Sequence, residues 1–134
     1  MTLEAALFNR LTTHAGLTAL IAARCYPILL PQEPTLPAVT YQRVAGAHLQ
    51  EFQMPAPIAR GRYQVTARGT SYASTRAVAT QVRLALDGLS GLMGGVGGVN
   101  VWVMMLSDID LYDPEPRWFY AAMDFEIWYQ EAVT

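Results

Sequence analysis

The clearest pattern in the chain is a strict alternation of apolar and polar positions near its C-terminal end. Odd-numbered positions from Phe119 to Tyr129 are apolar, whereas the even-numbered positions include Asp124, Glu126 and Gln130. A period of two places one set of side chains on each face of a β-strand. The preceding residues 113–116 hold two acids and two prolines, a composition that a helix does not cross. The pattern predicts a long hairpin with an acidic turn.

Helical spacing of apolar residues predicts two other regions. The first helix begins after Thr2, a residue type that caps helices, and ends near residues 12–14, with a further helical turn at 17–21. Its apolar stripe recurs every four residues: Leu3, Leu7 and Leu11. The longest helix is predicted from Tyr72 to Leu86, and Gly88 is well placed just beyond its end.

Three more segments predict strands, at residues 38–44, 58–68 and 99–106. We expect Gly46 to end the first strand and residues 47–57 to form an exposed loop. The segment 99–106 is apolar on both faces, so we expect it to be central in the sheet or covered by a neighbour.

Two segments rich in proline or glycine are expected to connect these elements. Residues 26–37 hold four prolines, which exclude helix and central strand, and predict a loop that wraps the surface. Residues 88–98 hold six glycines and predict a flexible connection. The order of elements predicts one domain over residues 1–134 with an α+β fold. Its mainly antiparallel sheet would have about four strands, with helices packed on one face and a long hairpin.

Composition adds that the surface is unusually apolar. Hydrophobic residues make up 52% of the chain and charged residues 15%, well below the usual ~25%. We therefore expect other subunits or partners to cover part of this surface. The N-terminus lacks the pattern of a signal peptide, and no apolar run is long enough for a membrane span. These features predict a cytoplasmic location in the producing cell and no membrane partner.

The charge pattern argues against a nucleic-acid-binding protein. The net charge is −2, and the basic residues, all arginines, form no basic run. Proteins that bind DNA through its phosphates need such positive charge, so no sequence-specific nucleic-acid partner is expected.

The sequence offers little catalytic chemistry, and we predict no enzyme, no cofactor and no metal. Cys25 with His14 or His48 is the one thiol pairing available, and no signature surrounds it. The acidic residues at positions 108–115 lack the glycine and distal glutamate of a calcium loop. The glycine run follows a helix and lacks lysine, unlike a phosphate-binding loop.

Charged side chains on the predicted strands leave two alternatives open. Arginines lie on or beside one strand, and acids lie on one face of the last strand and before the acidic turn. They pair either within one chain or between subunits around a ring. Together with residues of the predicted loop, they form the candidate interface: Arg60, Arg62, Arg68, Asp108, Asp110, Asp124, Glu126, His48, Gln50, Glu51 and Phe52.

The order of motifs along the chain resembles one known family. The motifs include RYQVTAR at 62–68, SYASTRAVATQVRLALDG at 71–88 and DLYDPEPRWFYAAMDFEIWY at 110–129. In order and spacing they resemble the small tail-completion (tail terminator) proteins of long-tailed bacteriophages and of prophage-derived gene transfer particles.

The resemblance implies a function that composition does not indicate. Proteins of this family form a ring, usually sixfold, on the head-proximal end of the tail tube. The ring ends tube polymerisation and provides the surface for joining the head. Expected partners are further copies of the chain, the tail-tube protein and a head-completion or neck protein. We also expect the loop at residues 47–57 to contact the tube or neck. A head-side neck adaptor is the structural alternative.

Overall fold

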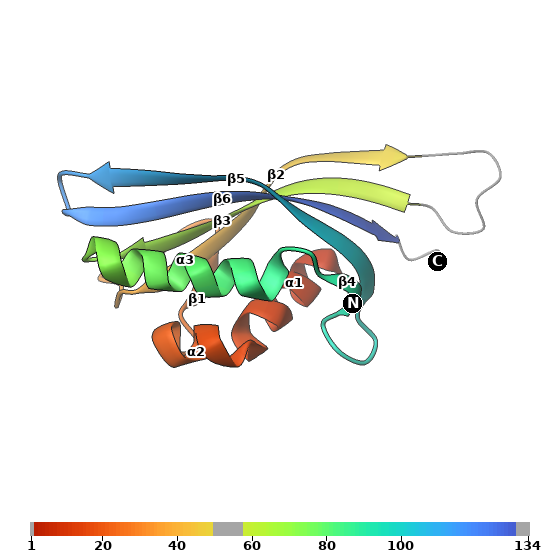
Figure 1. Cartoon of the computed structure of the whole chain (residues 1–134), viewed down its shortest axis with the longest axis horizontal. Helices are drawn as coiled ribbons and strands as arrows, with labels where there is room; N and C mark the ends of the chain where they lie inside the picture. Colours follow the sequence, from red (N-terminus) through yellow and green to blue (C-terminus); the bar gives the residue numbers. More distant parts are fainter. Residues whose placement is uncertain (1, 50–57, 131–134) are drawn as a thin grey trace.

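The computed structural model describes residues 2–49 and 58–130 as an α+β fold built on one six-stranded sheet. The strand order is β1-β2-β3-β6-β5-β4. Figure 1 shows the helices on one side of this curved sheet, as the sequence predicts. The helices are α1 (Leu3–Thr13), α2 (Ala15–Ile21) and α3 (Tyr72–Leu86), and the strands are β1 (Cys25–Pro27), β2 (Ala38–Leu49), β3 (Ile58–Gly69), β4 (Ser90–Met93), β5 (Val99–Asp113) and β6 (Trp118–Gln130).

Two of the helices, α1 and α3, start where the sequence supplies side-chain caps. The Thr2 hydroxyl accepts a hydrogen bond from the Ala5 amide at 3.2 Å, and the Ser71 hydroxyl accepts one from the Ser74 amide at 3.2 Å. Each cap satisfies an amide that has no partner within the first helical turn. The predicted bounds of α3 are confirmed.

The core lies between the helices and the face of the sheet that the alternation in β6 predicts. Ala121, Met123, Phe125 and Ile127 of β6 are completely buried. They belong to one apolar cluster with side chains of β3 and the helices, among them Val65, Leu7, Leu11, Val78 and Val82. The even-numbered side chains of β6 lie on the opposite face, which we call the outer face.

The sheet has six strands, where the sequence predicts about four, because two short edge strands complete it. β1 pairs with β2 in parallel, so the sheet is mixed, and it includes Pro27 at the edge, where proline is tolerated. β4 lies inside the glycine-rich segment that was predicted to be a flexible connection, and it forms a hairpin with β5. Gly94, Gly95 and Gly97 have positive φ angles, so these glycines shape the turn.

The first predicted strand is longer than its pattern indicates. β2 continues through Gly46 to Leu49, because β3 pairs with it along this whole stretch, as far as Leu49 opposite Ile58. The expected loop at residues 47–57 therefore begins three residues too early. Residues 50–57 lie outside the described part of the chain.

A β-bulge determines which side chains of β5 face outward. The register between β5 and β6 shifts between Met105 and Ser107, so Leu106 is an extra residue. Before the bulge, even-numbered side chains face outward, and after it odd-numbered ones do, including Ile109 and Leu111. Asp108 and Asp110 are turned toward the helix side.

The described part of the chain covers only one face of residues 99–106, and the expected cover by a neighbour stays a prediction. Val101 and Val103 are buried, but Trp102, Met104 and Leu106 are exposed on the outer side. β5 lies next to an edge strand and has no layer over its outer face among the described residues. In the same residues, none of the helices has the length and apolarity required to span a membrane.

Candidate assembly surfaces

The outer face of β3 and β6 carries a band of ion pairs within one chain. Arg60 Nε lies 3.1 Å from Glu126 Oε1, and Arg62 Nη2 lies 2.6 Å from Asp124 Oδ2. Gln64 donates a second hydrogen bond to Asp124 at 3.2 Å. Arg62 lies opposite Glu126 in the ladder, so both ion pairs run diagonally between the strands. Of the two alternatives left open by the sequence, the structure thus contains the pairing within one chain. Exposed pairs of this type contribute roughly 1 kcal/mol or less.

Aromatic side chains of β6 hold Arg60 and Arg68 against the sheet. The Arg60 guanidinium lies 5.3 Å from the centre of the Trp128 ring, and that of Arg68 lies 4.7 Å from the centre of Tyr120. Arg68 Nε also donates to the Thr40 hydroxyl at 3.2 Å. Cation–π contacts at exposed sites are worth about 0.5–1 kcal/mol. The arginines are therefore oriented before any partner binds.

Asp108 and Asp110 bind Arg76 of α3, a residue that the sequence did not identify as important. The Arg76 guanidinium makes two hydrogen bonds to Asp108, at 2.8 and 3.0 Å, and one to Asp110 at 3.0 Å. The Tyr72 hydroxyl donates to Asp110 at 2.9 Å. The hydrogen bond to Asp108 raises the pKa of Arg76 further above its usual value. The prediction that these acids contact another subunit stays a prediction.

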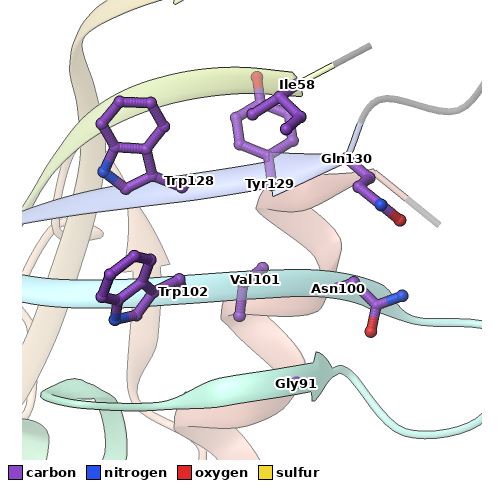
Figure 2. A pocket seen from close by; sticks show the side chains of 8 residues that line it. All are labelled: Ile58, Gly91, Asn100, Val101, Trp102, Trp128, Tyr129 and Gln130. Atoms are coloured by element: carbon purple, nitrogen blue, oxygen red, sulfur yellow. The ribbon is translucent and has the colours of Figure 1, made fainter. Parts of the chain in front are cut away.

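An apolar surface, which we call the β5 stripe, runs along the outer side of β5. All its members are exposed, and the exposed fraction of Trp102 reaches 63%. Figure 2 shows Trp102 and Trp128 side by side on neighbouring strands, where they line a hollow of about 200 Å³. The stripe comprises Trp102, Met104, Leu106, Ile109 and Leu111.

A second hollow, which we call the β2-edge pocket, lies at the opposite edge of the sheet. Its volume is about 370 Å³. The Tyr63 hydroxyl donates to Glu4 at 3.0 Å, and burial raises the pKa of Tyr63 above its usual range. Arg43 at the pocket has no ion pair among the described residues. The pocket is lined by Glu4, Pro27, Ile28, Tyr41, Gln42, Arg43 and Tyr63.

The only cysteine of the chain has the character of a core residue. Cys25 is buried, and burial raises the pKa of its thiol from an ordinary 9.0 to about 12. A thiol with this pKa is not an effective nucleophile near neutral pH. His14, one of its proposed partners, instead lies 3.3 Å from the Gln81 side-chain oxygen. Across residues 2–49 and 58–130, no three His, Cys, Asp or Glu side chains gather in a way that would hold a metal ion.

The contacts described above do not include the other predicted interface residues. His48 belongs to β2, whereas Gln50, Glu51 and Phe52 lie outside the described residues. Sequence reasoning missed Arg43 and the C-terminal half of the β5 stripe. The apolar pattern at residues 99–106 was the available signal for the stripe, but the bulge at Leu106 interrupts its period.

Comparison with protein families shows which family the chain matches. The family model described as Tail completion protein gp17 matches residues 5–130. The chain belongs to this family. The resemblance inferred from motif order is thereby confirmed, and the chain is a structural protein of the phage tail-completion class.

A structural comparison supports the same fold. A chain from a virion of a native gene transfer agent (GTA) particle is similar, with a TM-score of 0.72 and 16% sequence identity. The similarity covers 96% of this chain and 95% of the other chain. A search of curated proteins by sequence found no match. At this identity the likeness establishes the fold, while the family assignment rests on the family model.

Proposed function

We propose that this protein forms a ring on the head-proximal end of a phage-type tail tube, ends tube polymerisation and provides the surface for head–tail joining. The observation that carries the proposal is the tail-completion family match across residues 5–130. Its partners would be further copies of the chain, the tail-tube protein and a head-completion or neck protein. It would assemble in the host bacterial cytoplasm and remain in the neck region of the virion.

The surface of the chain supports an assembled state. Exposed apolar side chains gather in the β5 stripe, and contiguous apolar surface of this type marks an interaction site. A closed ring requires two different, complementary surfaces on each subunit. The β5 stripe and the β2-edge pocket lie toward opposite edges of one sheet, and we assign them to these two roles. Similarity to a chain of a GTA virion also supports a place in such a particle.

The alternative, a head-side neck adaptor, is separated by a binding experiment. Purified protein carrying a gold label would be mixed with tail tubes that lack it, or with DNA-filled heads, and imaged by electron microscopy. We expect label at one end of each tube and no further tube growth after free tube protein is added. Label on heads alone would favour the adaptor, and label on neither would contradict both functions.

A further inference from the structure

We propose that the β5 stripe and the acidic turn after it dock on the β2-edge pocket of a second copy of this chain. This inference rests on the proposed ring and specifies its subunit contact. It concerns surfaces that a single chain leaves uncovered.

Both surfaces lie beyond short strands that protect only part of each sheet edge. β4 pairs with β5 only at residues 99–102, so most of the β5 stripe extends past it. On the opposite edge, β1 pairs with β2 only as far as Tyr41. The β2-edge pocket begins at this point. Trp102 is exposed although β4 pairs beside it, so the β5 stripe is open because no layer of the described chain lies over the outer face of β5. The stripe and the pocket thus lie toward opposite edges of the sheet, and they differ in sequence and shape.

The two surfaces face opposite sides of the sheet, which suits overlap between neighbours. The β5 stripe belongs to the outer face, whereas Tyr41, Arg43 and Tyr63 belong to the helix-side face, as their register with buried residues of β3 shows. Docking would place the outer face of one copy over the helix-side face of the next, so that neighbouring subunits overlap. Repetition of such a heterologous contact closes a ring when the rotation per subunit allows it.

One charged contact between the two surfaces is available, between the acidic turn and Arg43. Asp113 and Glu115 of the acidic turn have no ion pair among the described residues, and neither has Arg117 beside them, which leaves a net charge of −1. At the pocket, Arg43 is a cation without an ion pair in the described part of the chain, and Glu4 is a carboxylate that accepts the hydrogen bond of Tyr63, so the pocket as a whole carries no net charge. Asp108, Asp110, Asp124 and Glu126 are already paired with arginines inside the chain. Arg43 is therefore the side chain of the pocket that the acids of the turn would meet.

A second copy accounts for these surfaces better than an unrelated partner. Each chain carries both halves of the contact, so a ring covers every stripe and every pocket. Stable interfaces bury roughly 800 Å² per partner, more than five half-exposed side chains provide. The acidic turn and the walls of the pocket would supply the remaining area. Ile28, which is 61% exposed at the pocket, is the apolar side chain best placed to meet the stripe.

Cysteine cross-linking tests this geometry directly. We would combine Leu111→Cys with Ile28→Cys in one full-length chain and oxidise the assembled protein on tail tubes. The natural Cys25 is buried, so it should not compete. We expect a ladder of covalent multimers on a non-reducing gel. The matched control combines Leu111→Cys with Leu84→Cys, an exposed apolar position on α3 outside both surfaces, and should give no ladder.

A second pair of substitutions tests the same contact without requiring two cysteines to align for a disulfide. Ile109→Glu with Leu111→Glu should raise the protein concentration needed for half-assembly by more than about tenfold. Val96→Glu, at a fully exposed loop position, should not change it. Intact rings with neither the ladder nor the loss of assembly would overturn the proposed contact and leave the ring function standing. A wild-type chain that forms no ring and caps no tube would contradict both.

Discussion

At the scale of single residues, the charges that the sequence displays are largely neutralised inside one chain. Arg60 and Arg62 pair with Glu126 and Asp124, and Arg76 pairs with two acids of β5. The sequence predicts which charges share a strand, but it does not predict their partners, because a diagonal pair depends on strand register. The unpaired Arg43 is evident only after register and burial are known.

Cys25 gives a prediction about alkaline stability. Its folded pKa of about 12 exceeds the ordinary value of 9.0, so the unfolded chain loses the thiol proton first as pH rises. The stability associated with the neutral thiol is fully present below pH 9 and is lost progressively toward pH 12. Urea unfolding across this range should therefore show a smaller decline for Cys25→Ala than for the wild type. Tyr63, whose pKa is also raised by burial, will contribute a background decline to both proteins.

The same residue has a simpler chemical test. A thiol reagent at pH 8 should react with Cys25 only after denaturant is added, because the side chain is buried. Rapid reaction in the native protein would contradict the burial and, with it, the expected pH dependence.

At the scale of elements, Arg76 joins α3 to the C-terminal half of β5. The guanidinium bridges Asp108 and Asp110, and the Arg76 side chain is only about one-third exposed. We expect Arg76→Ala to lower the free energy of unfolding by about 1–2 kcal/mol, because charge-assisted hydrogen bonds are lost and two neighbouring acids remain unpaired. Chemical denaturation followed by circular dichroism would measure the change.

Arg83→Ala is the matched control for this prediction. Arg83 is on the same helix, but it is more exposed and its contact with Asp87 is 3.7 Å long. Its loss should cost no more than about 0.5 kcal/mol. Equal effects of the two substitutions would show that Arg76 does not fix β5 to the helix.

The elements also show how far local pattern predicts this fold. α3 and β6 follow from periodicity and caps, because each has one uninterrupted buried face. β1 and β4 are too short to show a period, and their pairing depends on longer neighbours. Two bulges, after Arg43 and after Met105, change the outward face within a strand. Such shifts are determined by the whole sheet, so the exposed half of the β5 stripe was not predictable from alternation.

At the scale of the whole molecule, the low charge and the position of the apolar residues both favour a protein that works in an assembly. The chain is 52% hydrophobic, and a substantial part of that content remains on the outer side of β5 and around Ile28 and Leu29. A folded core thus does not use all the apolar side chains. The expectation from composition that partners cover this surface stays a prediction, and the ring proposal gives it a specific form.

The most direct test of the central claim is the absolute mass of the purified protein by light scattering, alone and with tail-tube protein added. The account predicts a defined complex with about six copies of the chain, either preformed or formed when tubes are added. A preformed ring would be stable over a range of concentrations. Protein that keeps the mass of a single chain in both samples and does not bind the tubes would contradict the account.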